Sequence, residues 1–340
     1  GGGGGGGGGA ARRGLRAMWL KAFAPLPGEE GHDVVVLEDD IELSPYWLVW
    51  LHLAAAAFHL PGREAAQRAR GVVGISLCTP RLDEISVTRD SAAPHLRRWP
   101  ASLHVAAPAY LMQLPSSWGA LYFRHALRRF ESFYRLRTVP QLYSFVREAE
   151  GGSAAREASE PVLALPNSRA NGWPRSWKRF FLDWMVAEGL VMLYPSLPEE
   201  ASFSTTHVEP GEHTAPRAGR AQPTSELGLR ADDGGEIDRD RTVPLVARGA
   251  QLRPLLGGAL PPYRALAVVD LHARASTLCQ LARQATRYAD DVRALVRARV
   301  VAASGAGGEA AGAERARELE EAVLRLLQGA VAAPPPERCE

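Results

Sequence analysis

The chain has 340 residues, of which 46% are hydrophobic and 23% charged, and its formal net charge at pH 7 is +2. These values are ordinary for a globular protein and exclude a chain that is disordered throughout. A net charge this small also lacks the concentrated basic footprint of a nucleic-acid-binding protein, so we expect no nucleic-acid partner.

Composition divides the chain into five segments. Residues 1–14 begin with nine glycines and are expected to be a low-complexity tail, whereas residues 15–211 hold a long series of strand and helix patterns. Residues 212–260, rich in Pro, Gly, Arg and Asp, predict an irregular linker or loop. Residues 261–330 predict a strand and a helical extension, and 331–340 a proline-rich tail. No run of about 18 uncharged apolar residues is present.

Apolar periodicity and capping residues place the expected helices and strands. In chain order, the patterns predict a helix over 15–24, a strand over 33–38 covered on both faces, a helix from Ser44-Pro45 to about 60, strands over 71–77 and 103–112, a helix from Ser116 or Ser117 to about 137, a helix over 174–189, strands over 190–194 and 265–271, and helices over about 273–300 and 313–329. This alternation predicts an α/β fold, with a mostly parallel sheet flanked by helices.

An acidic triplet, Glu38-Asp39-Asp40, follows the valine-rich strand and precedes the expected helix at Ser44-Pro45. Ligands of open α/β sheets bind at the carboxyl ends of the strands. Neighbouring carboxylates there offer the hard oxygen ligands that Mg²⁺ or Mn²⁺ prefers, and the helix dipole would favour a bound diphosphate. The plain alternative is a helix-capping acidic turn.

Residues 34–47, which read VVVLEDDIELSPYW, resemble the Glu-Asp-Asp form of the acidic motif of GT-A glycosyltransferases. The likeness is to an uncharacterised plant and algal group of such proteins and, more distantly, to N-acetylglucosaminyltransferase I. It continues in the same order through Ser117-Trp118-Gly119 and an aromatic segment that starts at Trp173, to a serine-rich turn ending at His207.

The resemblance implies roles for individual residues. Asp40 would bind the metal directly, Asp39 and Glu38 would help to hold the metal, its waters or the nucleotide ribose, and His207 would approach the metal or diphosphate from the second half of the domain. Trp118 is a candidate platform for the acceptor sugar, and Gly119 would let the backbone approach the substrate.

The general base of such a transferase is not evident. Residues 110–115, where the resemblance implies an acid, contain none. Asp183 is the best substitute and Glu209 the next, although an exposed helix charge is the plainer interpretation of Asp183. At helical spacing, Trp177 and Trp184 are expected in the core.

The resemblance thus implies a metal-dependent hexosyltransferase-like enzyme that uses Mn²⁺ or Mg²⁺. It would move a sugar from a nucleotide-sugar, most simply a UDP-sugar, to a hydroxyl of a glycan, glycoprotein or glycolipid. Relatives of this kind act at the Golgi membrane behind an N-terminal anchor, which is expected only upstream of this sequence. The chain is therefore N-terminally incomplete in this interpretation. Because only 37 residues precede Glu38, we also expect the chain alone to bind UDP poorly. Two alternatives stay open, a catalytically degenerate scaffold or binding protein of the same fold and a metal-dependent phosphohydrolase.

Overall fold

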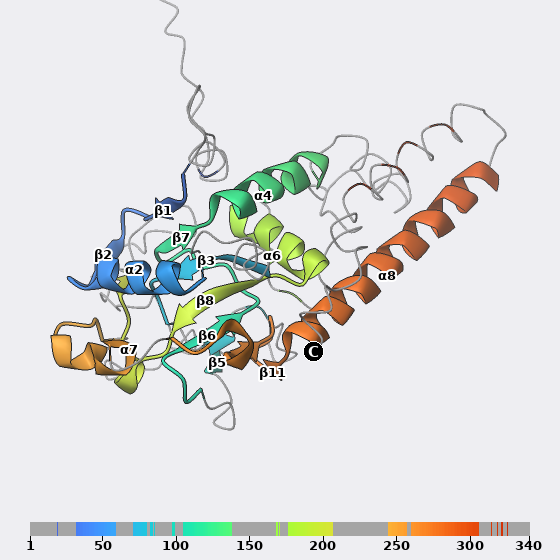
Figure 1. Cartoon of the computed structure of the whole chain (residues 1–340). Helices are drawn as coiled ribbons and strands as arrows, with labels where there is room; N and C mark the ends of the chain where they lie inside the picture. Colours follow the sequence, from blue (N-terminus) through green and yellow to red (C-terminus); the bar gives the residue numbers. More distant parts are fainter. Residues whose placement is uncertain are drawn as a thin grey trace, which may run out of the picture.

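A computed structural model describes residues 32–58, 71–79, 105–137, 176–206, 244–256 and 260–305, with Trp19 and a few further single residues. Its centre is a seven-stranded sheet in the order β1-β7-β3-β8-β6-β10-β11. The strands are β1 (Val34–Val36), β3 (Val72–Ser76), β6 (Ala109–Met112), β7 (Ala120–Tyr122), β8 (Val191–Pro195), β10 (Ala267–Val269) and β11 (Ala275–Ser276). Helices flank this sheet (Figure 1), so the predicted α/β class is confirmed.

The sheet is mixed. Parallel pairing joins β3 to β8 and β6 to β10, and the other neighbours are antiparallel. Every residue of β3, β6 and β8 is buried, which explains their nearly continuous apolar sequences. The core therefore lies along the centre of the sheet.

The first strand is an exception to the pattern read from its sequence. β1 lies at the edge of the sheet, pairs antiparallel with β7, and its three valines are only half-buried. The expectation of a strand covered on both faces is therefore wrong, because a β-branched run does not distinguish a central strand from an edge strand.

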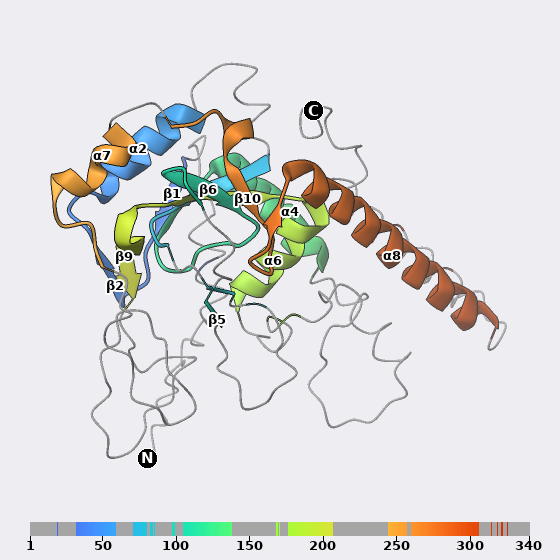
Figure 2. The same ribbon diagram turned by 90° about the horizontal axis from the view of Figure 1, so that it is seen from below.

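Within the described residues, four helices have eight or more residues: α2 (Trp47–Phe58), α4 (Arg124–Arg137), α6 (Trp177–Glu188) and α8 (Leu278–Gly305). Figure 2 shows α2 on one side of the sheet and α6 on the other. α6 ends at Gly189 as predicted, and this glycine adopts the left-handed conformation. Its start differs from the prediction, because the helix begins at Trp177, where the Ser176 hydroxyl accepts a hydrogen bond from the Lys178 amide and caps it. A Cβ on Gly189 would lie 3.0 Å from the Leu281 carbonyl oxygen, so glycine also lets α8 pack closely.

Shorter elements complete the description. They are β2 (Ile41–Leu43), β9 (Ser204–Thr206), β4 (Leu82–Asp83), β5 (Arg97–Arg98), α7 (Arg253–Leu256) and the 3-10 turns η3 (Pro198–Glu200), η5 (Gly249–Leu252) and η6 (Tyr263–Ala265). β2 pairs antiparallel with β9, and β4 pairs with β5. Residues 244–246 pack against the serine-rich turn, where the Val246 amide donates to the Ser202 carbonyl at 2.9 Å.

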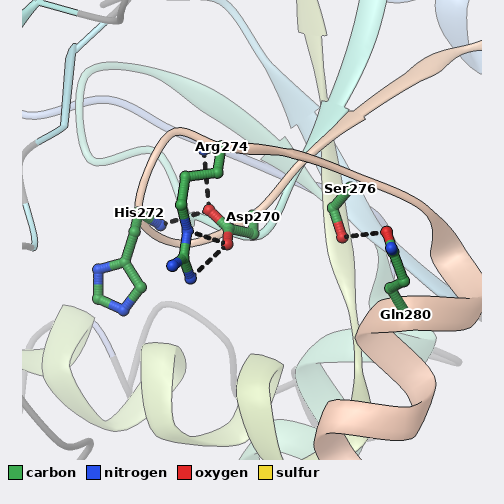
Figure 3. A network of polar contacts seen from close by, with 5 residues as sticks. All are labelled: Asp270, His272, Arg274, Ser276 and Gln280. Carbon is green, nitrogen blue, oxygen red and sulfur yellow. Dashed lines mark hydrogen bonds and ion pairs between the residues drawn. The ribbon is translucent and has the colours of Figure 1, made fainter.

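The hairpin of β10 and β11 is organised by one carboxylate (Figure 3). Asp270 is 5% exposed, and its Oδ1 accepts from the backbone amides of His272 and Arg274, both at 2.9 Å. Its Oδ2 accepts from the Arg274 guanidinium at 2.8 Å. Ala273, at the tip, has a φ of +54°. These bonds satisfy both oxygens of Asp270.

Two expected helices lie mainly outside the described residues. Of 15–24, the structure describes Trp19, which is helical and buried. Of 313–329, four residues are described, at positions 314, 318, 321 and 325, and all are helical. Among the residues described, no helix combines the length and the apolar character that a membrane span requires.

Candidate functional site

The acidic triplet lies in a tight turn between two strands. β1 ends at Val36, Asp39 and Asp40 form the turn, and the Ile41 amide donates to the Glu38 carbonyl at 3.2 Å. β2 starts at Ile41, and its pairing with β9 anchors the far side of the turn. Glu38 and Asp40 are half-buried, whereas Asp39 is exposed.

One expectation for this turn is wrong. The triplet is followed by β2, and α2 begins only at Trp47, so the triplet does not precede a helix N-terminus. The Ser44 hydroxyl still accepts from the Tyr46 amide at 3.1 Å, as a cap would, and it donates to the Val246 carbonyl at 2.5 Å. The electrostatic support for a diphosphate expected from this helix therefore does not apply.

Trp118 and Gly119 lie opposite the triplet across the sheet edge. Val36 pairs with Ala120, so the antiparallel register brings the residues that precede β7 beside those that follow β1. Gly119 has a φ of +85°, and a Cβ there would lie 3.4 Å from the Leu37 Cδ2 atom. The Ser204 hydroxyl donates to the Trp118 carbonyl at 2.5 Å. Two predicted site residues are thus brought to the triplet.

The long helix expected to start at Ser116 or Ser117 begins instead at Arg124, after β7. The Asp33 Oδ1 atom accepts from the Arg124 amide at 2.8 Å and caps α4 from 91 positions away. The carbonyl of Ser116 accepts from the Tyr122 hydroxyl at 2.6 Å. Trp118 therefore does not lie at the start of a helix, although it does lie near the acidic triplet.

A lysine that the sequence did not single out completes this cluster. Lys178 lies in the first turn of α6 and is 6% exposed, and its Nζ atom lies 5.4 Å from the centre of the Trp118 ring. Its charge is close enough to Glu38 to lower the pKa of that carboxyl. Buried lysines are rare, so the burial of Lys178 near both the Glu38 carboxylate and the Trp118 ring marks it as a candidate site residue.

Aromatic rings form the floor beneath Glu38. The Trp19 indole hydrogen-bonds to the Glu38 carboxylate. Trp19 stacks on Trp177 with ring centres 3.7 Å apart, and both rings meet the edge or face of Tyr122 at 6.0 Å. The carboxylate is thereby held over an apolar surface that cannot solvate its charge.

Glu38 is a weaker acid than an ordinary glutamic acid. Burial, followed by the neighbouring charge of Asp40, raises the pKa of Glu38 from 4.5 to about 7, against the opposing effects of Trp19 and Lys178. Burial and the nearby Glu38 also raise the pKa of the Tyr122 hydroxyl well above its ordinary value. The protein therefore concentrates more negative charge at this turn than it neutralises.

A divalent cation fits this chemistry. Glu38, Asp39 and Asp40 supply the hard oxygen atoms that Mn²⁺ or Mg²⁺ prefers, and a cation beside them would relieve their mutual repulsion. Within the described part of the chain, no three His, Cys, Asp or Glu side chains are already arranged around one point. The other ligands of such an ion would come from substrate oxygens and water.

Of the remaining predicted site residues, the structure describes Asp183. Asp183 is 1% exposed in α6, so the plainer interpretation of an exposed charge is wrong. Helical geometry places it about 7.5 Å along and about 140° around the axis from Lys178, away from the triplet. His207 and Glu209 lie outside the described residues. Trp177 and Trp184 are core residues, as expected.

Comparisons of the chain with protein-family models, with curated proteins and with solved structures found no match.

Proposed function

We propose that this chain is a metal-dependent glycosyltransferase that transfers a sugar from a nucleotide-sugar to a hydroxyl acceptor. The observation that carries this proposal is the acidic turn after β1, where Glu38, Asp39 and Asp40 are crowded at the carboxyl end of an edge strand. Burial and Asp40 hold the pKa of Glu38 near 7, so a bound dication would lower the electrostatic cost of the turn. The order of the acidic turn and Trp118-Gly119 along the chain, and the register that brings them together, support the same proposal.

Asp40 and Asp39 would hold the Mn²⁺ or Mg²⁺ ion, with Glu38 behind them. When bound, the cation supplies Lewis-acid stabilisation of the negative charge on a leaving diphosphate. Trp118 is half-buried and presents a flat apolar ring on which a sugar face can stack. Lys178 adds a positive charge over that ring, 5.4 Å from its centre, where it can attract a phosphate oxygen.

We assign no general base, because Asp183 is turned away from the cluster and Glu209 lies outside the described residues. The alternative is a degenerate scaffold of the same fold, which binds its ligand without turnover. In either case we propose that the chain acts at the Golgi membrane, the compartment of the proteins that it resembles.

Metal binding is the direct test. Calorimetry of the full chain should detect one Mn²⁺ site, which tightens when UDP is added at millimolar concentration. Replacing the pair Asp39→Asn and Asp40→Asn should weaken Mn²⁺ binding at least tenfold. Asp290 and Asp291 are another adjacent and exposed pair, on α8, so the same double change there is a matched control and should leave binding unchanged.

Turnover separates the candidate functions. Release of UDP from UDP-sugars that requires Mn²⁺ supports the transferase, and hydrolysis of a simple phosphomonoester would instead favour the phosphohydrolase. Mn²⁺ and UDP binding without turnover would favour the scaffold. Equal Mn²⁺ binding by the wild type and the Asp39/Asp40 variant would overturn the proposal.

A further inference from the structure

Helix α2 lies at the surface but has the composition of a buried helix. Its sequence, WLVWLHLAAAAF, contains no Asp, Glu, Lys or Arg. A helix that is apolar on all sides is normally covered on all sides. α2 departs from this rule, because Leu48 is 60% exposed and Val49 is 37% exposed.

A second segment, which lies next to the start of α2, also carries an exposed apolar side chain. The Ser44 hydroxyl bonds to the Val246 carbonyl, and a Cβ on Gly249 would lie 3.8 Å from the Tyr46 hydroxyl. These contacts place η5 and α7 beside the start of α2, as both views show (Figures 1 and 2). On α7, Leu256 is 59% exposed. Within the described residues, three of the four exposed large hydrophobic side chains are Leu48, Val49 and Leu256.

The two segments that carry these side chains contain two arginines and no acidic residue. Arg248 and Arg253 are exposed on η5 and α7. Residues 44–58 and 244–256 contain no Asp or Glu, and the acidic residue nearest to them in sequence is Glu42 on β2. We call Leu48, Val49, Leu256, Arg248 and Arg253 the α2–α7 surface. It combines exposed apolar side chains with two exposed arginines.

We propose that the α2–α7 surface binds the interface of a membrane that contains anionic lipids. Exposed leucine and valine side chains gain free energy by entering the boundary between headgroups and acyl chains, and arginines there are attracted to lipid phosphates. A helix of 12 residues is about 18 Å long, shorter than the roughly 30 Å core of a bilayer, so α2 would lie on the membrane. This inference does not depend on the proposed transferase activity.

Vesicle sedimentation of the full chain tests this proposal. The chain should sediment with phosphatidylcholine vesicles that contain 30% phosphatidylserine, and at least tenfold less with phosphatidylcholine alone. The variants Leu48→Gln with Leu256→Gln, and Arg248→Glu with Arg253→Glu, should each lose at least tenfold of this binding. Arg283 and Arg287 are exposed on α8, which projects at the other end of the molecule. Their double change to Glu alters net charge equally and should keep binding.

Four outcomes would overturn the proposal. They are no sedimentation with either vesicle, equal sedimentation with both, an equal loss in the α8 control, and a concentration-dependent dimer that Leu48→Gln abolishes, which would make a second copy the occupant. Thermal melting of each variant verifies that it is folded. If the leucine pair does not fold, Val49→Ser and the arginine pair carry the test, and retained binding in both contradicts it.

Discussion

Two turns of the molecule carry acidic residues after a valine-rich strand, and they differ in what surrounds the carboxylates. At the β10–β11 turn, two backbone amides and one guanidinium occupy both oxygens of Asp270. At the β1–β2 turn, three carboxylates follow one another, and Asp40 and burial raise the pKa of Glu38 to about 7. The first turn uses its carboxylate to hold the backbone, whereas in the second turn burial and neighbouring carboxylates disfavour the charged form of Glu38. An acidic residue after a strand is therefore a weaker indication of a ligand site when amides and a guanidinium already occupy both of its oxygens, as at Asp270.

The largest expected difference between the two turns is in activity. Asp40→Asn should lower Mn²⁺-dependent release of UDP about a hundredfold or more, because metal stabilisation of a leaving group amounts to several kcal/mol. Asp270→Asn should leave the activity of the folded fraction within about threefold. Initial rates at 15 °C, corrected for the folded fraction by circular dichroism, measure both. A greater loss of activity in Asp270→Asn than in Asp40→Asn would contradict this contrast between the two turns.

Stability should show the reverse order. Asp270→Ala should lower the free energy of unfolding by about 2–4 kcal/mol, because two backbone donors and a guanidinium lose a buried acceptor. Asp40→Ala should change it by less than about 1 kcal/mol or increase it, since it removes repulsion with Glu38. Urea denaturation monitored by fluorescence measures the difference. Arg274→Ala is the control within the turn and should cost about 1 kcal/mol, because its side chain is 65% exposed.

The pH dependence of stability sharpens the contrast. A carboxyl whose pKa is higher in the folded state binds a proton more tightly there, so Glu38 makes the protein less stable as pH rises from about 4.5 to about 7. Glu38→Gln should therefore be more stable than the wild type at pH 8, by on the order of 3 kcal/mol, and equal to it near pH 4. Melting temperatures across this range measure the difference, and a pH-independent difference would contradict the assigned cause. Added Mn²⁺ should reduce it by stabilising the wild type.

The sequence predicted local features better than distant partners. Strands β3 and β8 and the end of α6 could be read from apolar runs and Gly189, because their determinants lie within a few residues. The pairing of β2 with β9 joins residues about 160 positions apart, and Asp33 caps α4 across 91 positions. No pattern within a few residues of the sequence predicts such distant partners.

The candidate site shows the same division. The triplet and Trp118-Gly119 were singled out from residue type and order, and the register of β1 and β7 unites them. Lys178 was missed because a lysine in the first turn of a helix ordinarily indicates a solvated charge, and only tertiary packing buries it. Its place next to three aromatic residues at positions 173, 177 and 180 was the one available signal.

The smallest expected effect concerns the tip of the β10–β11 turn. Ala273 has a φ of +54°, which costs an alanine about 1 kcal/mol relative to glycine. Ala273→Gly removes this strain, but it also removes a fully buried methyl group, worth about 0.8 kcal/mol, and raises the entropy of the unfolded chain. These terms oppose one another, so urea denaturation should give a change within about 1 kcal/mol in either direction. A loss of stability as large as that of Asp270→Ala would mean that the backbone conformation of residue 273 contributes as much to this turn as the Asp270 carboxylate. The β10–β11 turn would then no longer be an example of a turn held together by its acidic residue.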